Sequence, residues 1–414
     1  MIIISNGFNK FHMAVAAAEL DRHGRLAQFL TGAYPKEWMR PWLQKPFFKT
    51  RKISRFLDRR ENIPEGLISS LWLSEALHDF RMVCRRRPLL NRLDPLCNRL
   101  SFRWYARQAK KIIARSSRAR IYHYRAGFGH ESVVVARRSG MVALCDHSIA
   151  HPAVLQYLVD HQGRLPANGQ KGPMDRLWQD ILADIEQSDH VLVNSDFVKE
   201  TFVHQGWAPE RVHVIYLGVD AAFLDAIPSR VNGAGREKNG VRLLFGGCFE
   251  RRKGAEVLIQ ALLQLDDLPW RLEIAGPIAD DIQRQYHSFL KDSRVEHKGL
   301  LSRKKLAEWM AEGGIFVFPS LAEGSARVVF EALACGCYPI TTPNSGSIVE
   351  DGVHGRLIPA GDVEALAEAI RKALGDRGQL VEIGRRNAAL VHTSYRQSDY
   401  GEKLITLYDR LVQK

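Results

Sequence analysis

Residues 315–336 read IFVFPSLAEGSARVVFEALACG, and this stretch decides the fold class of the chain. Its first part, residues 315–320, is a short apolar run typical of a buried strand, whereas residues 326–334 have the apolar spacing of a helix that ends before a glycine. Glu323 and Glu331 therefore lie on a junction of strand, loop and helix. Such junctions are typical of a parallel sheet that is covered by helices.

The beginning of this helix is expected to bind an anion. Free amides of Ser325, Ala326 and Arg327 would point outward at the positive end of the helix dipole, where a phosphate binds well. Glu323 comes before this point and Glu331 lies inside the helix. A nucleotide-sugar, which has hydroxyl groups on both sides of a diphosphate, suits this layout. The alternative is that Glu331 merely forms a helix-surface ion pair with Arg327.

The residues around the two glutamates resemble the hallmark of glycosyltransferase family 4, whose members retain the anomeric configuration. Its pattern, E-G-x-x-x-x-x-x-E-A-x-A-C-G, is matched by residues 323–336. The strand at 338–342, the loop at 344–349 and the turn at 350–359 follow in the order of that family. The resemblance is dense from residue 192 to residue 367. It implies an α/β fold called GT-B, in which two Rossmann-like domains with parallel sheets face a central cleft.

The organisation of the chain also indicates two domains, because 414 residues exceed one ordinary core. Strand-like and helix-like segments alternate through most of the sequence. We expect an acceptor-side domain over residues 1–220, a linker over 221–240 and a domain that binds the nucleotide-sugar over 241–395. The resemblance implies that a last helix, at 396–414, crosses back to the first domain. Residues 36–98 are irregular by this measure and predict an insertion of helices.

The resemblance assigns roles to several residues of the second domain. Lys253 stands where the family places a phosphate-binding lysine, Glu331 would accept hydrogen bonds from the ribose hydroxyls, and Glu323 would contact hydroxyls of the donor sugar. The base would be read by the backbone of residues 298–300, which includes Gly299 and Leu300. Glycine at position 276, at the end of a strand, is expected to let the backbone approach the ligand.

A second phosphate-binding residue is less clearly marked. The family usually has a basic residue early in the loop that leads to Lys253, and this chain has Gly247 or Cys248 there. Arg251 or Arg252 would then substitute, unless they form no more than a charge cluster at the start of a helix. Arg327 stands where many members carry an apolar residue, and it faces either the phosphate or Glu331.

The first domain is expected to contribute a loop and a histidine. Gly7 lies in the place of the family's glycine-bearing loop after the first strand. His147 and His151 follow another strand, and either of them matches the histidine that lies near the reacting carbon. Without this resemblance, both would be taken as structural or solvated side chains. Catalysis would consist of positioning and of electrostatic stabilisation of the leaving diphosphate, without a protein nucleophile.

The formal charge of +13 indicates an anionic partner. Much of the excess lies between residues 36 and 60, where basic residues alternate with five aromatic ones, Trp38, Trp42, Phe47, Phe48 and Phe56. This mixture is typical of a surface that contacts an anionic membrane. A solvated basic face over ordinary core aromatics is the alternative.

The remaining features point to a cytoplasmic enzyme. No apolar run approaches the ~20 residues that span a bilayer, residues 1–7 predict a first strand rather than a signal peptide, and six scattered cysteines predict reduced thiols. No Asp-x-Asp signature accompanies a sugar-binding strand, so neither a metal nor a cofactor is expected. The expected substrates are a UDP-sugar or GDP-sugar donor and a carbohydrate or lipid-linked acceptor. The basic surface would place the enzyme at the inner face of the membrane.

Two other classes of protein were weighed against this interpretation. A Rossmann-type epimerase or oxidoreductase would need G-x-G-x-x-G after the first strand, and that spacing is absent after residue 4. A basic nucleic-acid-binding protein would explain the charge, but it gives no role to residues 323–336. Nucleic acid is therefore not an expected partner.

Overall fold

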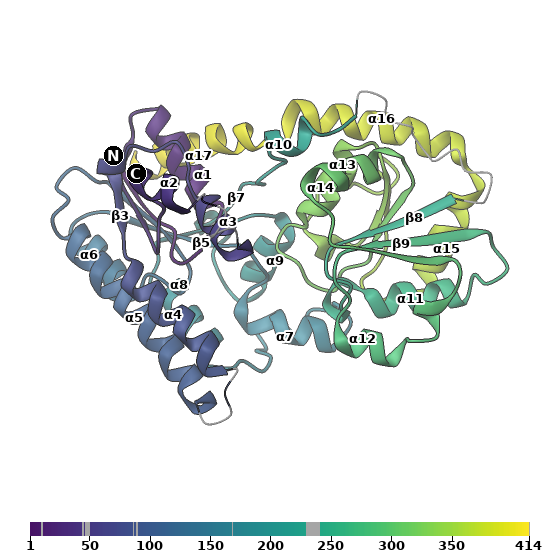
Figure 1. Ribbon diagram of the computed structural model, residues 1–414, viewed down its shortest axis with the longest axis horizontal. Coiled ribbons are helices and arrows are strands. Elements are labelled where there is room, and N and C mark those ends of the chain that lie inside the picture. The colour runs from purple at the N-terminus through teal and green to yellow at the C-terminus, as the bar shows by residue number, and fades with distance from the viewer. Residues whose placement is uncertain are drawn as a thin grey trace.

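The computed structural model describes the chain except for residues 10, 44, 46–49, 86, 88, 89, 168, 229–240 and 414. Two sheets, both wholly parallel in their strand pairs, lie at opposite ends of the long axis of the molecule (Figure 1). The two sheets confirm the predicted α/β class.

The first sheet has the order β3-β2-β1-β4-β5-β6-β7. Its strands are β1 Ile2–Ser5, β2 Leu26–Thr31, β3 Ile68–Ser70, β4 Ile121–Arg125, β5 Val142–His147, β6 His190–Val193 and β7 Val212–Val214. The second sheet has the order β10-β9-β8-β11-β12-β13. Its strands are β8 Val241–Gly246, β9 Trp270–Ala275, β10 Val295–Gly299, β11 Ile315–Phe318, β12 Tyr338–Thr341 and β13 Arg356–Leu357.

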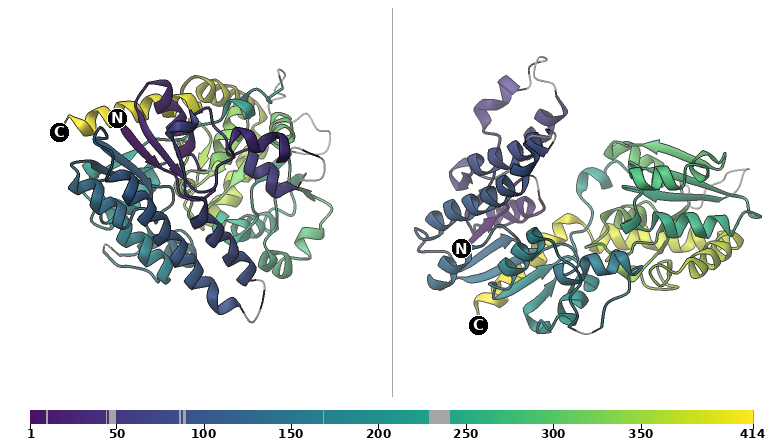
Figure 2. Two further views of the ribbon diagram at one scale, coloured as in Figure 1. Left: turned by 60° about the vertical axis from the view of Figure 1, so that its left-hand side comes forward. Right: turned by 90° about the horizontal axis from the view of Figure 1, so that it is seen from below.

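Helices connect the strands and cover the sheets. Those of the first half are α1 Met13–Arg22, α2 Arg40–Leu43, α3 Arg51–Leu57, α4 Trp72–Arg85, α5 Asp94–Ile113, α6 Glu131–Arg138, α7 Pro152–Asp160, α8 Arg176–Ile185, α9 Asp196–His204 and α10 Ala221–Leu224. Those of the second half are α11 Ala255–Leu263, α12 Asp280–Gln285, α13 Arg303–Ala311, α14 Arg327–Ala334, α15 Val363–Gly375, α16 Arg377–Ser394 and α17 Gln397–Val412. Helices α4 and α5 pack side by side along one flank of the first sheet (Figures 1 and 2).

The inner strands of both sheets are mostly apolar and buried on both faces, because helices cover both sides of each sheet. In β1, the successive residues Ile3 and Ile4 are both fully buried, and they belong to separate hydrophobic clusters on the two faces. The central strands of the second sheet, β8 and β11, are buried along their whole length in one continuous core. This packing leaves the loops at the strand ends as the places where a ligand can bind.

One strand was missed from the sequence. The segment from residue 36 to residue 98 was expected to be an insertion of helices, but it also contributes β3, which pairs with β2 at the edge of the first sheet. β3 has three residues, two of them serines, and each is half-buried. Such a short edge strand has too little apolar alternation to be recognised from sequence.

The chain connects the two halves at two adjacent places. Val219, which follows the first sheet, donates its N–H to the carbonyl of Tyr395 at 2.8 Å. The carbonyl of Val219 accepts from the N–H of Gln397, the first residue of α17, at 2.9 Å. Helix α17 then packs on α1 beside the N-terminus (Figure 1). There the hydroxyl of Tyr408 lies 2.7 Å from Nδ1 of His123. The domain limits stay a prediction, because most of the expected linker, residues 229–240, lies outside the described residues.

Candidate functional site

A cavity of about 550 Å³ lies at the carboxyl edge of the second sheet. Its walls are formed by the loops that follow β8, β9, β10 and β11 and by the first turn and a half of α14. The lining residues are Gly247, Cys248, Lys253, Ala275, Gly276, Pro277, Leu300, Leu301, Arg303, Leu306, Phe318, Glu323, Ser325, Ala326, Arg327, Val328 and Glu331. The carboxyl edge of a parallel sheet is where ligands bind in open α/β folds. Most of the residues that the sequence predicted for the second half therefore converge on one cavity.

Lys253 and Glu323 lie next to each other in the lining of this cavity. Lys253 ends a short 3-10 turn, Arg251–Lys253, between β8 and α11, and its Nζ lies 3.7 Å from Oε1 of Glu323. The same carboxylate oxygen accepts a hydrogen bond from Nη1 of Arg252 at 2.7 Å. Two cations thus hold the Glu323 carboxylate in place beside the loop that leads into α14.

The two arginines before Lys253 are engaged by protein carboxylates. Arg251 is half exposed and pairs with Glu256 of α11 at 3.2 Å, outside the cavity lining. Arg252 bridges Glu250, at 2.8 Å, and Glu323. Phosphate binding by Arg251 or Arg252 stays a prediction, and this geometry does not favour it.

Glu331 is buried in α14, with 5% of its surface exposed. Burial raises the pKa of its carboxyl group above the usual value, although the Arg303 guanidinium opposes that shift. Nη1 of Arg303, at the start of α13, donates to Oε1 of Glu331 at 2.5 Å. Arg303 could not be predicted from the sequence, because β11 separates α13 from α14 along the chain and the two helices meet only in the fold.

Arg327 does not pair with Glu331, which was one of the two alternatives. Its Nη2 donates instead to Oδ2 of Asp220 at 2.9 Å. Arg303 donates to the same Asp220 oxygen. Asp220 caps α10 by accepting from the amide of Phe223 and comes directly after the crossing point at Val219. The Asp220 carboxylate, which precedes the second sheet in the chain, therefore orients two arginines of the cavity. Sequence reasoning missed this residue.

The amides at the beginning of α14 are not all free. Ala326, the N-cap residue, donates its N–H to the carbonyl of Ser345 at 2.9 Å, so the expectation of three free amides is wrong at this position. The chain after β12 approaches the loop so closely that it takes up this donor. Ser325 and Arg327 still line the cavity on either side of it.

The first half of the chain presses on the loop between β11 and α14. Ser195 Oγ donates to the carbonyl of Gly324, and a methyl group added to Gly324 would clash with the carbonyl oxygen of Ser148. Glycine is required at 324 by this approach of two backbones. The segment that carries His147 and His151 thus lies against the turn next to Glu323.

The two candidate histidines are buried and neutral. His147 is the last residue of β5, and His151 caps α7 by accepting from the amide of Ala153 at 3.2 Å. Both rings contact Phe202, with centroids at 5.6 and 4.8 Å. Burial lowers the pKa of His147 to about 4 and that of His151 to about 3. Neither histidine belongs to the cavity lining, so a role near the reacting carbon stays a prediction for both.

The predicted glycines have different surroundings. Gly276 has φ +141°, and a side chain there would clash with the carbonyl of Gly247. The absence of a side chain at Gly276 therefore lets the loops after β8 and β9 approach each other. Gly299 accepts a hydrogen bond from the Gly276 amide at 2.8 Å. Gly7 lies in the loop after β1, where its amide donates to the Tyr105 hydroxyl at 3.2 Å. Leu300 is largely exposed and lines the cavity mouth.

Within the described part of the chain, no cluster of three or more His, Cys, Asp or Glu side chains has the arrangement of a metal site. The expectation of a reaction without a metal or another cofactor stays a prediction.

Comparison with known proteins bears on the same two halves. Residues 71–223 match a family model described as Glycosyltransferase Family 4, and residues 240–376 match one described as Glycosyl transferases group 1. D-inositol 3-phosphate glycosyltransferase 1 of Catenulispora acidiphila is 30% identical over 228 residues, which cover 50% of this chain and 54% of that protein. The matched part spans about half the length of such curated relatives.

Solved structures share the fold over nearly the whole chain. Sucrose-phosphate synthase of Thermosynechococcus elongatus has a TM-score of 0.64 at 18% identity, over 99% of this chain and 98% of that one. Anabaena Alr3699/HepE, solved with UDP and glucose, has a TM-score of 0.58 at 16% identity, over 99% of this chain and 100% of that one.

Two parallel sheets, with a cavity at the carboxyl edge of the second, define the GT-B class of folds, and the predicted fold class is confirmed. The two family matches together cover most of the chain. The protein belongs to glycosyltransferase family 4, as the sequence resemblance implied.

Proposed function

We propose that this protein is a retaining glycosyltransferase that moves a hexose-like sugar from a nucleotide diphosphate to a carbohydrate or lipid-linked acceptor, in the synthesis of a glycan or polysaccharide. One observation carries the proposal. A single cavity gathers two carboxylates, Glu323 and Glu331, and three cationic side chains, Lys253, Arg303 and Arg327. This is the chemistry that a diphosphate flanked by two sets of hydroxyl groups requires.

The charges have divided tasks in this proposal. Negative charge grows on the leaving diphosphate as the glycosidic bond breaks, and Lys253 and Arg327 stabilise it from fixed positions. Glu331 accepts hydrogen bonds from the ribose hydroxyls, and Glu323 accepts them from the donor sugar. The Arg303 guanidinium already donates a hydrogen bond to the Glu331 carboxylate in this structure. The ribose hydroxyls must therefore share the carboxylate with Arg303 or displace it. The remaining rate enhancement comes from holding donor and acceptor together.

The donor is proposed to be a UDP-sugar or a GDP-sugar. A solved relative of the same fold, Alr3699/HepE, holds UDP and glucose, which favours UDP as the first nucleotide to test. The relative from Catenulispora acidiphila is named for D-inositol 3-phosphate. That name offers one acceptor to try alongside neutral sugars and lipid-linked sugars.

Thermal unfolding in the presence of UDP, GDP and ADP tests the proposal, because a ligand that binds the native state raises the melting temperature. We expect one of the three to raise it, and the Glu331→Ala variant to lose most of that increase. Product analysis with the matching nucleotide-sugar then shows whether the anomeric configuration is retained. If no nucleotide shifts the wild-type melting temperature, the proposal is wrong.

We also propose that the protein binds the cytoplasmic face of the membrane. Trp38, Trp42 and Trp72 are 67%, 62% and 56% exposed, and Nζ of Lys45 lies 4.4 Å from the ring centre of Trp42. Exposed indole rings beside cations are typical of side chains that enter an anionic lipid interface. The predicted contributions of Phe47 and Phe48 lie outside the described residues. Among the helices that the structure describes, none combines the length and apolarity that crossing a bilayer demands.

Co-sedimentation with vesicles tests this surface. We expect wild-type protein to bind vesicles that contain phosphatidylglycerol and to be released by salt, since anionic lipid attracts the basic residues. The Trp38→Ser/Trp42→Ser variant should bind less. Equal binding to purely zwitterionic vesicles would contradict an electrostatic contribution.

A further inference from the structure

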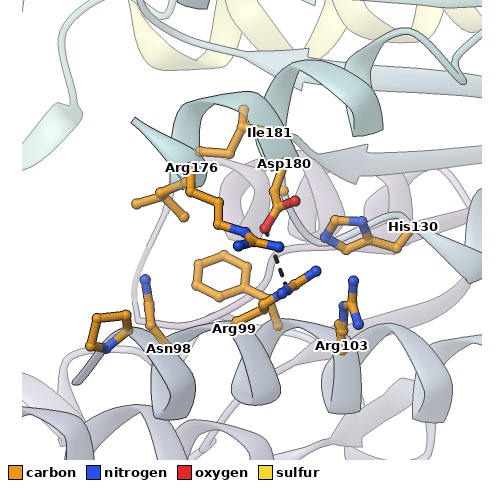
Figure 3. A pocket seen from close by; sticks show the side chains of 11 residues that line it. Asn98, Arg99, Arg103, His130, Arg176, Asp180 and Ile181 are labelled. Carbon is orange, nitrogen blue, oxygen red and sulfur yellow. Dashed lines mark ion pairs between the residues drawn. The ribbon is translucent and has the colours of Figure 1, made fainter. Parts of the chain in front are cut away.

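A hollow in the first half of the chain, which we call the arginine pocket, gathers positive charge away from the diphosphate cavity. It has a volume of about 100 Å³ and lies between α5, α8 and the turn that follows β4. Arg99 and Arg103 reach it from α5, Arg176 reaches it from α8, and His130 reaches it from the turn (Figure 3). Three separate segments of the chain thus place basic side chains around one small space.

The protein balances the charges in the arginine pocket only in part. Its one carboxylate among the lining residues, Asp180, lies 3.8 Å from Nε of Arg99. For Arg103 and Arg176, no hydrogen bond or ion pair joins the side chain to another residue in the described part of the chain. Cations that converge without counter-charges repel one another, and an anion between them would remove that cost.

The turn beside the pocket is held in a strained conformation. His130 has φ +42° and ψ −124°, which a side-chain-bearing residue rarely adopts. The buried carboxylate of Asp184 maintains this geometry, since it accepts from the amides of Gly127, Gly129 and His130 at 2.7, 3.0 and 2.5 Å. A strained residue that the surrounding structure fixes so firmly is typical of a functional site.

The position of the pocket in the fold also favours a ligand. The turn follows β4, which neighbours β1 at the point where the strand order of the first sheet reverses. Ligands of open α/β sheets bind beside such a reversal, at the carboxyl ends of the strands. Phe102 forms an apolar wall of the pocket and packs on Phe128 with ring centres 4.5 Å apart. An aromatic wall therefore separates the pocket from the loop that carries Gly7.

We propose that the arginine pocket binds an oxyanion of the phosphate type, held by Arg103 and Arg176 with Arg99 and His130 beside them. Guanidinium groups form paired, charge-assisted hydrogen bonds with such anions. The space corresponds to about three water molecules, which suits a single phosphate group rather than a nucleotide. This site is separate from the diphosphate cavity and does not depend on the proposed transfer reaction.

Calorimetric titration with inorganic phosphate tests the proposal. All proteins are titrated in saturating UDP, so that any nucleotide site contributes equally. The Arg103→Gln/Arg176→Gln variant should bind phosphate at least roughly tenfold more weakly than wild type, because two charge-assisted hydrogen-bonding groups are lost. The control, Arg115→Gln/Arg118→Gln, removes the same charge from exposed positions after α5 and should keep wild-type affinity.

A second titration distinguishes the source of the phosphate. If glucose 6-phosphate binds more tightly than inorganic phosphate, glucose itself does not bind, and the first variant loses the binding, the pocket takes a phosphate carried by a sugar. If both phosphates bind alike, the ligand is a free oxyanion. Equal phosphate affinity in wild type and in Arg103→Gln/Arg176→Gln, or no binding by wild type, would overturn the proposal. Unchanged melting temperatures would show that the variants fold.

Discussion

The carboxylate of Asp220 accepts a hydrogen bond from the Arg327 guanidinium, with Oδ2 and Nη2 2.9 Å apart. Asp220 follows Val219, where the chain leaves the first half beside the returning segment at Arg396. Arg327 begins α14 and lines the candidate site. This ion pair therefore joins the crossing between the two halves to the place where we propose that the leaving diphosphate binds.

Arg327 is expected to replace the basic residue that is absent at position 247 or 248. Arg327→Leu should weaken binding of UDP-glucose or slow its turnover by roughly 10- to 100-fold, because one fixed positive charge near the diphosphate is removed. Adding Cys248→Arg should recover part of this loss, since Cys248 lines the same cavity. Calorimetry and steady-state kinetics measure both effects. A fully active Arg327→Leu variant would show that the arginine serves only its contact with Asp220.

Lys253 is expected to act mainly after the donor has bound. Lys253→Ala should lower kcat by roughly 100-fold or more, with a smaller change in donor affinity, because the lysine opposes charge that develops as the bond breaks. Arg251→Ala is the matched control, since Arg251 pairs with Glu256 outside the cavity. The assignment fails if the two variants have the same kcat.

Donor binding is expected to weaken as the pH falls toward the pKa of Glu331. That pKa is raised by burial, so the carboxylate takes up its proton at a higher pH than an exposed glutamate does. A protonated Glu331 can accept fewer hydrogen bonds from the ribose. The dissociation constant of UDP-glucose, whose phosphates stay ionised under these conditions, should rise as the pH is lowered from neutral toward the range where an exposed glutamate titrates.

Glu331→Gln supplies the control for this pH dependence. The amide cannot ionise, so the variant should bind UDP-glucose more weakly at neutral pH and with a flatter pH profile. A wild-type profile that stays level while the variant binds normally would exclude Glu331 from the ribose site.

Acid is expected to destabilise the protein through its buried histidines. The unfolded chain protonates His151 near pH 6.5, whereas in the folded protein its pKa is about 3, so stability is lost as the pH falls below 6.5. The loss from this residue approaches about 3 kcal/mol near pH 4. His151→Asn keeps a side chain that caps helices well but cannot take up the proton.

The urea midpoint at about pH 7 and about pH 5 measures this effect. Acidification should lower the midpoint less in His151→Asn than in wild type. His287→Asn, at an exposed position, should respond as wild type does. Identical shifts in all three proteins would show that His151 has no part in the acid sensitivity.

The second half of the fold follows closely from local sequence. The strand β11 is a short apolar run that is buried along its whole length, and α14, at Arg327–Ala334, begins within one residue of the helix predicted at 326–334. The pattern around Glu323 and Glu331 also predicted several of the side chains that line the cavity, among them Ser325 and Arg327. Local features suffice for this part of the site because one strand-loop-helix unit carries Glu323, Arg327 and Glu331.

The contacts that cross between units were not predictable in this way. Arg303 and Glu331 lie on different helices, and Asp220 lies in the first half of the chain, between β7 and α10. Their pairing depends on how helices pack and on where the chain crosses between halves. No spacing in the sequence records such distances, so the sequence leaves open whether Arg327 pairs with Glu331, whereas in the fold Arg327 pairs with Asp220.

The sequence by itself determined the family, the α/β class and the place of the candidate site at the carboxyl edge of the second sheet, because period and motif are local properties of the chain. The tertiary structure decided which charges are paired: Arg327 with Asp220, Arg303 with Glu331, and Arg252 with Glu323. It also brought Arg99, Arg103 and Arg176 together at a second pocket. The physical reason is that Coulomb interactions depend on separation in space, which only the packed fold fixes.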